Sequence, residues 1–167
     1  MPKLSVFLFF SLFIFSCSNE PSLKIIQGEI YGTTWQLKYS SDEDEVPIKA
    51  IVISELNRID KLFSHYKDDS LTSLINKNKI AYKDVAEEWK KLDKVGWDVH
   101  QQSNGYFNHK VSGDYDFNSF AKGYAVDKVS NILKATNINN FMVEIGGALR
   151  FEGLNTSKPW AFALEDP

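Results

Sequence analysis

The chain has 167 residues, of which 43% are hydrophobic, so it is long enough for one hydrophobic core of ordinary size but not for two independent domains. The formal net charge is −3, and this lack of a basic surplus argues against nucleic acid as a partner. Phenylalanines are concentrated in the first fifteen residues, and the composition of the remaining chain is unexceptional.

The first residues predict an exported lipoprotein. Lys3 supplies a positive charge, residues 4–15 form an apolar segment too short to span a bilayer comfortably, and a small residue precedes Cys17. Cys17 is the only cysteine, and it follows a sequence that resembles the bacterial lipobox. We therefore expect residues 1–16 to be a lipoprotein signal peptide and residues 17–27 to be a tether. Cys17 is expected to anchor the exported protein in a bacterial membrane, on the periplasmic side or at the cell surface. An ordinary cleaved signal peptide is the alternative.

The next segment predicts two strands and a helix. Apolar and polar residues alternate from Ile26 to Tyr39 on either side of Gly32-Thr33, which is typical of two strands joined by a turn or bulge. Pro47 suits the first helical position, and it is followed by apolar residues at helical spacing: Ile48, Val52, Leu56, Ile59 and Phe63. We expect a core-facing helix over Pro47–Phe63.

Two interpretations are open for the polar stretch after this helix. His65 lies near Asp68 and Asp69, which could indicate a metal site or an acid–base site. The spacing of these residues matches no standard ligand pattern, so a polar loop between helices is favoured. Ser70 is placed to cap a short helix that follows the loop.

A second long helix is predicted in the middle of the chain. Asp84 and Glu87 have the spacing of a capping box, and Asn104-Gly105 is a helix end. The apolar stripe of this helix consists of Val85, Trp89, Leu92, Val95 and Val99. In the short polar stretch that follows, a brief strand is predicted and His109 is expected at the surface.

The third helix is predicted to begin near Ser119, with Asn118 or Ser119 as its cap. Lys122 then falls in the first turn, where the helix macrodipole disfavours a cation unless an anion is bound. Because free N–H groups at helix N-termini bind phosphate, and Gly123 leaves room for close approach, one interpretation is a phosphate site. The alternative is a lysine that extends into solvent beside a packing glycine.

The last part of the chain predicts more strands. Phe141–Ile145 reads as a strand, and the Gly146-Gly147 pair after it suits either a sharp turn or close contact with a ligand. A final strand is expected over Trp160–Leu164. The fold class is α+β, with a largely antiparallel sheet and helices packed on it.

Taken together, these segments resemble the ApbE family of FAD:protein FMN transferases. The resemblance runs from about Gly28 to Pro167 and keeps the family's motif order: YGTTW, LNRIDKLFSHYKDDSLTSLIN, GYFN, DFNSFAKGYAVDKV, FMVEIGGALRFEG and WAFALEDP. It implies one ApbE-like domain over residues 28–167. The implied activity is Mg²⁺-dependent transfer of FMN from FAD to a Thr or Ser hydroxyl of an acceptor flavoprotein, with release of AMP.

The resemblance also implies the site residues. Lys122 would act on the reacting pyrophosphate, and the backbone carbonyl of Ser119 would reach Mg²⁺. The residues that would contact FAD are Tyr31, Tyr66, Tyr106, Phe107, Asn108, Asp116, Lys122, Gly146 and Gly147.

The chain departs from the family pattern in three respects. Asn108 stands where the family usually has Asp, which removes a negative charge. An insert of several dozen residues is missing between GYFN and DFNSF, and the C-terminal part with the Asp and Thr side chains that complete the magnesium site is also missing, so we expect a truncated chain. Two alternatives to the transferase are an FAD pyrophosphatase, which forms FMN and AMP, and a flavin-binding lipoprotein without catalysis.

Overall fold

The computed structural model describes residues 22–41 and 45–163. Its strands are β1 (Leu23–Ile30), β2 (Thr33–Ser40), β3 (Lys110–Val111), β4 (Asp114–Tyr115), β5 (Phe141–Ile145) and β6 (Ala148–Glu152). Its helices are α1 (Glu45–Phe63), α2 (Leu71–Asn76), α3 (Glu87–Gln102) and α4 (Asn118–Ala135), with a 3-10 helix over Tyr82–Asp84.

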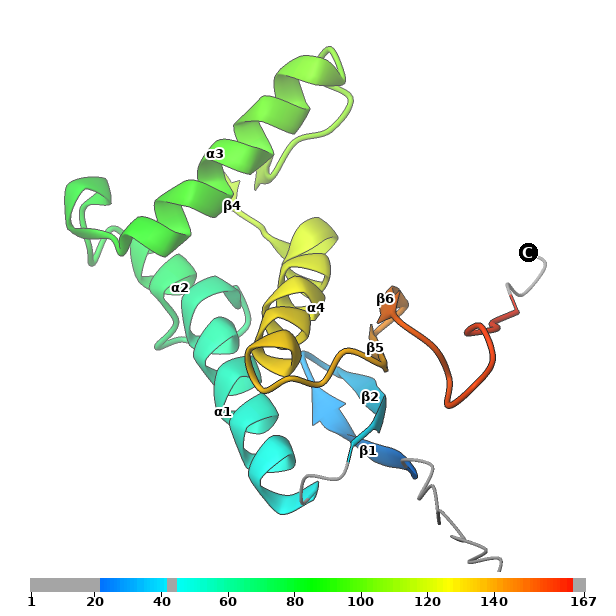
Figure 1. Cartoon of the computed structure of the whole chain (residues 1–167). Coiled ribbons are helices and arrows are strands. Elements are labelled where there is room, and N and C mark those ends of the chain that lie inside the picture. The colour runs from blue at the N-terminus through cyan, green and yellow to red at the C-terminus, as the bar shows by residue number, and fades with distance from the viewer. Residues whose placement is uncertain (1–21, 42–44, 164–167) are drawn as a thin grey trace, which may run out of the picture.

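The described strands form two antiparallel sheets. The larger has the strand order β1-β2-β5-β6, and the smaller is the β3-β4 hairpin. Helices α1 and α4 lie side by side over one face of the larger sheet, whereas α3 extends away from that sheet (Figure 1). The predicted α+β class with an antiparallel sheet and packed helices is confirmed.

Two-residue turns connect β1 to β2 and β5 to β6 in the larger sheet. Tyr31 and Gly32 have φ of 55° and 69°, and Gly146 and Gly147 have φ of 53° and 89°. Positive φ at both central residues matches the right-handed twist of the strands on either side, which is why glycine is favoured there. The predicted first turn is confirmed, one residue earlier than Gly32-Thr33.

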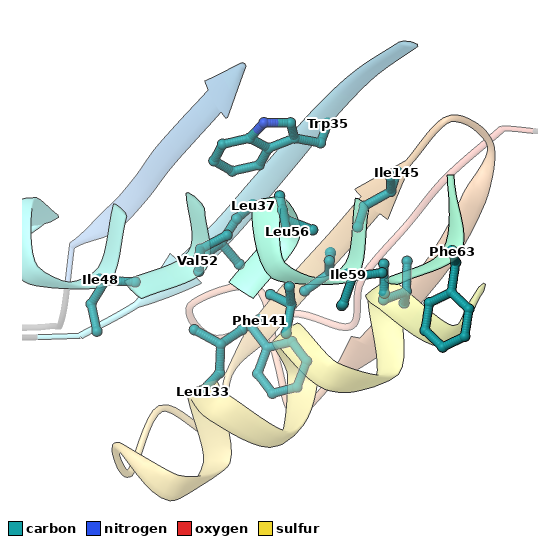
Figure 2. Packing of buried hydrophobic residues seen from close by; sticks show 14 of the residues in the cluster. Trp35, Leu37, Ile48, Val52, Leu56, Ile59, Phe63, Leu133, Phe141 and Ile145 are labelled. Atoms are coloured by element: carbon teal, nitrogen blue, oxygen red, sulfur yellow. The ribbon is translucent and has the colours of Figure 1, made fainter. Parts of the chain in front are cut away.

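The core lies between the sheet and its two helices (Figure 2). Alternate residues of β2 and β5 point to the helices because strand side chains have a period of two. The buried sheet residues are Ile26, Trp35, Leu37, Tyr39, Phe141, Val143 and Ile145. Facing them are Ile48, Val52, Leu56, Ile59 and Phe63 of α1 and Ala125, Val126, Val129 and Leu133 of α4. The predicted apolar stripe of α1 is therefore confirmed.

Only the first part of the predicted α3 stripe is buried. Trp89 and Leu92 are buried, but Val95 and Val99 are exposed. His109 is also completely buried, so its predicted surface position is wrong. Its Nε2 lies 2.7 Å from Oδ1 of the buried Asp93, and this pairing compensates the cost of burying two polar groups between α3 and the β3-β4 hairpin.

Several predicted boundaries differ from the structure. Ala86, rather than Asp84, is the N-cap of α3, and its side chain makes no capping bond, so the predicted capping box is absent. Strand β1 begins at Leu23, so residues 23–27 of the expected tether belong to the sheet. The described residues 160–163 are not a strand; instead Trp160 Nε1 donates a hydrogen bond to the Glu152 carbonyl.

The predicted signal peptide and Cys17 lie outside the described residues. Among the residues that are described, no helix is both long and apolar enough to cross a bilayer.

Candidate functional site

The N-terminal end of α4 is where the predicted site residues converge. Phe117 precedes the helix and is completely buried, with ring contacts to Phe63 at 5.2 Å and to Trp89 at 5.1 Å. This anchor fixes the start of α4 between α1 and α3. The polar residues on either side of Phe117 are thereby held at the surface, next to the buried aromatic cluster.

The helix start is capped differently from the prediction. Neither Asn118 nor Ser119 is the cap; Phe117 occupies that position, and Oδ1 of Asp116 accepts a hydrogen bond of 2.9 Å from the Asn118 N–H. The N–H groups of Phe120 and Ala121 both donate to the Phe117 carbonyl. Of the first four amides of α4, only that of Ser119 is left without an acceptor among the described residues. An anion at this site would therefore rely on side chains more than on free N–H groups.

Lys122 is the fifth residue of α4, one residue further along than predicted, because the helix begins at Asn118 rather than at Ser119. Its aliphatic stem packs against the β5-β6 turn, because a Cβ atom built on Gly146 would lie 3.1 Å from Lys122 Cδ and 2.7 Å from Thr33 Cγ2. Gly146 is thus required both by its positive φ and by the close approach of these side chains. Within residues 22–41 and 45–163, no carboxylate pairs with the Lys122 ammonium, so it is available to an anionic ligand.

The α1-α2 loop brings a second group of residues to the same place. Ser64 Oγ accepts hydrogen bonds from the N–H groups of Tyr66 and Lys67, which folds the loop tightly. Asn118 Nδ2 donates to Tyr66 Oη at 3.3 Å, and His65 Nδ1 lies 3.3 Å from Asp116 Oδ1. Two segments about fifty residues apart in the sequence are therefore joined at the start of α4.

Two cavities adjoin this site and share Asn118 and Lys122. The larger has a volume of about 790 Å³, and the smaller, of about 40 Å³, is lined by Tyr31, Tyr66 and Asp60 among others. The larger has an apolar wall, and its further lining residues include Leu92, Val95, Phe120, Tyr124 and Ala148, with Lys91, Asp127 and Ser119 as polar members. A cleft of this size, mostly apolar with a few charged groups, is typical of small-molecule sites.

Tyr31 is held by the fold rather than directed at a ligand. Its Oη donates a 2.8 Å hydrogen bond to the Leu56 carbonyl. Burial, followed by the nearby carboxylates of Asp60 and Glu55, raises the pKa of this phenol well above its usual value. Tyr31 therefore stays neutral, and it lines the smaller cavity beside Lys122.

The three residues predicted from the GYFN segment are not brought to the site together. Tyr106 is 96% exposed, and Asn108 Oδ1 accepts a hydrogen bond from the Lys110 N–H within its own loop. Only Phe107 reaches α4, through ring contact with Phe120 at 5.8 Å. Among the cavities described at the site, neither Tyr106 nor Asn108 is a lining residue. Gly147 forms part of the β5-β6 turn, where its N–H donates to Glu144 Oε1.

The polar loop interpretation of the residues after α1 is confirmed for the two aspartates. Asp68 pairs with Lys77 and Asp69 pairs with Lys61, and both carboxylates are exposed. No group of three His, Cys, Asp or Glu side chains in the described part of the chain could hold a metal ion. Because Mg²⁺ requires about six oxygen ligands, the predicted Ser119 carbonyl does not form a magnesium site with these residues.

Sequence reasoning missed two residues of the site. Asn118 was predicted only as a possible cap, and His65 only as part of a polar loop or of a metal or acid–base site with Asp68 and Asp69. The FSHY sequence places an imidazole directly beside the predicted FAD contact Tyr66, and this adjacency was the available signal. Nothing in the sequence shows that the loop folds back onto α4.

Comparison with known proteins gives a consistent family match. The ApbE family model matches residues 31–113 and 113–167. The FAD:protein FMN transferase of Haemophilus influenzae is 37% identical over 82 residues, which are 48% of this chain and 24% of that protein. The transferase of Buchnera aphidicola is 25% identical over 215 residues, covering 96% of this chain and 63% of that protein.

Solved structures show the same fold. The flavin transferase ApbE from Vibrio cholerae matches with a TM-score of 0.79 and 21% identity, over 88% of this chain and 65% of that one. The flavinyl transferase ApbE of Pseudomonas stutzeri, in its apo form, matches with a TM-score of 0.79 and 23% identity, over 87% and 66% of the two chains. The present chain thus spans less than two thirds of each of these four relatives.

The place of the missing insert agrees with these matches. The two parts of the family match meet at Gly113, which lies in the tight turn between β3 and β4. The alignment with the Buchnera protein is longer than this chain and therefore includes positions that the chain lacks. Because the family model matches nearly the whole of the described domain, the chain belongs to the ApbE family.

Proposed function

We propose that the site at the start of α4 binds FAD and that the protein transfers FMN from FAD to a Thr or Ser hydroxyl of an acceptor flavoprotein, releasing AMP. Membership of the ApbE family supports this function, as do the names of the relatives. The observation that carries it is that Asn118 and Lys122 line two adjoining cavities, the smaller of which also contains Tyr66. Among the described residues, no carboxylate pairs with Lys122. An aromatic ring beside a free cation suits a ligand that has both planar rings and phosphates.

In this proposal the chain acts by binding and positioning. The Lys122 ammonium offsets negative charge on the pyrophosphate as the bond between the FMN-side phosphorus and the bridging oxygen breaks. The acceptor hydroxyl attacks the phosphorus on the FMN side and loses its proton to water, and AMP leaves with the electrons of the broken P–O bond. Transfer of this kind needs alignment and charge stabilisation rather than a protein nucleophile.

Magnesium dependence is part of the family expectation, and we propose it for the reaction, with the Ser119 carbonyl as one ligand. The described residues do not complete such a site, so no step above is assigned to the metal. Titration of activity with Mg²⁺ after treatment with EDTA tests this expectation. Activity that is unchanged by EDTA would remove Mg²⁺ from the proposal.

The test of function is incubation of the full chain with FAD and Mg²⁺, with and without an acceptor flavoprotein. We expect AMP release that requires the acceptor, and covalent flavin on the acceptor. Equal AMP and FMN release without acceptor would instead show an FAD pyrophosphatase. Tight FAD binding without AMP release would show a flavin-binding protein that does not catalyse.

Lys122→Ala is the matching variant for this assay. We expect its transfer rate to fall at least tenfold, on the order of the loss of one charged contact to the transition state. Lys94→Ala is the control, because Lys94 pairs only with Asp98 on the exposed side of α3. A wild-type rate for Lys122→Ala at saturating FAD would refute the role of Lys122.

We also propose that Cys17 carries a lipid anchor that holds the protein at a bacterial membrane after export. The apolar segment before Cys17 and the single unpaired thiol support this location. Expression of wild type and Cys17→Ser with a labelled fatty acid tests it. Label and membrane association should be present in the wild type and absent from the variant; an unlabelled wild type would contradict the anchor.

A further inference from the structure

We propose that His65 is a positioning residue for the ligand site: its imidazole supports the Tyr66 ring from behind, so that the outer face of Tyr66 is presented to a planar ring of FAD. This inference rests on the proposed function. It concerns how the site is pre-organised, and it assigns no contact between His65 and the ligand.

The two rings are in close contact, in a tilted rather than a parallel arrangement. Their centroids lie 3.9 Å apart with an interplanar angle of 37°. Tyr66 is nevertheless 75% exposed, whereas the His65 side chain is only 25% exposed. The imidazole therefore lies against a tyrosine ring that remains mostly exposed and that lines the smaller cavity together with Lys122.

One ring nitrogen of His65 has no hydrogen bond among the described residues, which points to the ring itself as the functional part. Nδ1 is buried and makes no hydrogen bond among the described residues, although Asp116 Oδ1 lies 3.3 Å away. The contact between these two atoms is thus close but not aligned as a hydrogen bond. A residue kept mainly for polar bonding would pair this nitrogen.

Hydrogen bonds fix the His65–Tyr66 pair both at its backbone and at the tyrosine hydroxyl. The His65 carbonyl accepts a hydrogen bond from Ser73 Oγ at 3.3 Å, which ties the backbone of the loop to α2. Tyr66 Oη accepts from Asn118 Nδ2, and the Asn118 N–H donates to Asp116. These contacts hold both segments of the site in place around the contact between the His65 and Tyr66 rings.

Such support matters because an exposed tyrosine otherwise loses rotamer freedom when the ligand binds. A ring that is already held in place avoids this loss, so the affinity for the ligand is higher. Aromatic pairs of this kind are expected to change affinity about threefold to tenfold.

The test is fluorescence titration of FAD into the full chain and its variants. We expect His65→Ala and His65→Asn to raise the Kd for FAD about threefold to tenfold, and His65→Phe, which keeps a ring, to stay within about threefold of wild type. Thermal unfolding of each variant shows that it is folded. If Asn restores the affinity and Phe does not, or if Ala leaves it unchanged, the stacking role is overturned.

A double-mutant cycle with Tyr66→Ala separates positioning from a general structural effect. If His65 acts through Tyr66, then His65→Ala should change the Kd less than about twofold in the Tyr66→Ala background. Full additivity would overturn the proposal. Phe162→Ala is a matched control, because Phe162 is also an exposed ring in tilted contact with a neighbouring ring. That neighbour, Phe151, lies on the opposite face of the sheet from α4.

The outcomes also distinguish this inference from the proposed function. If the wild-type chain shows no saturable binding of FAD, the proposed function fails at its first step. If the wild type binds FAD and the His65 variants bind it equally well, only the inference about His65 fails.

Discussion

Removal of the Glu88 charge tests how α3 is held against the two helices of the core. Glu88 on α3 accepts hydrogen bonds of 2.6 Å and 2.8 Å from Arg58 on α1. It also accepts one from Tyr124 Oη and lies 3.3 Å from the Lys128 ammonium, both on α4. This single carboxylate therefore joins three helices, and with Tyr124 it fixes one wall of the larger cavity.

The expected magnitude follows from the charge interactions. The hydrogen bonds from Arg58 above all lower the pKa of Glu88 from 4.5 to about 2. A shift of that size corresponds to roughly 3 kcal/mol of stability at neutral pH if it is taken in full. The side chains of Arg58 and Glu88 are 42% and 27% exposed, so water screens the pair and we expect about 1 to 2 kcal/mol.

The variant Glu88→Gln should therefore unfold about 3 to 6 °C below wild type at pH 7, measured by circular dichroism. Because the folded-state pKa is lowered, the stabilisation is present above pH 4.5 and is lost as the pH falls toward 2. The difference between variant and wild type should disappear over that range.

Glu87→Gln is the control, because Glu87 pairs with Lys90 only on the exposed side of the same helix turn. Its melting temperature should equal that of the wild type. Equal stability of Glu88→Gln and wild type at pH 7, or a difference between them that stays constant down to pH 2, would refute the reasoning.

Three further substitutions test the packing around the site. Gly146→Ala should lower the free energy of unfolding by about 1 to 3 kcal/mol, because its Cβ would meet Thr33 Cγ2 at 2.7 Å. Gly147→Ala should cost less, because Gly147 has a positive φ but no atom within 4 Å of the added Cβ. Urea titration that ranks the two variants equally would contradict this. Asp93→Asn should cost about 1 to 3 kcal/mol because it weakens the buried partner of His109, and wild-type stability in the same assay would contradict that contribution.

Periodicity in the sequence predicted those parts of the fold in which one face of an element is buried. The α1 stripe and the β5 strand lie where they were expected, because burial of one face requires apolar residues at a period of 3.6 or 2. The same rule failed for α3, whose stripe continues beyond the part that is covered, so Val95 and Val99 are exposed.

Short polar segments were harder to predict. The burial of His109 depends on Asp93, and these residues are sixteen positions apart. The start of α4 is set by the buried Phe117, whereas capping rules considered only polar side chains there. In both cases a tertiary contact decides the local structure, and no local pattern records it.

The candidate site was only partly predictable, because some of its residues come together through tertiary contacts. The family resemblance indicated Tyr66, Asp116 and Lys122, and the structure brings them to one end of α4. It did not indicate His65 or Asn118, whose contributions arise from a fold-back of the α1-α2 loop. The predicted phosphate cradle of free N–H groups is largely replaced, since three of the first four amides of α4 are already bonded.

The central claim is that the start of α4 binds FAD through Lys122, and direct titration tests it without dependence on turnover. FAD should bind the full chain saturably, and Lys122→Ala should raise the Kd at least about tenfold. The variant should remain folded in thermal unfolding, since the ammonium forms no ion pair within residues 22–41 and 45–163. An equal Kd for Lys122→Ala and wild type, or no saturable binding of FAD by the wild type, would contradict the claim.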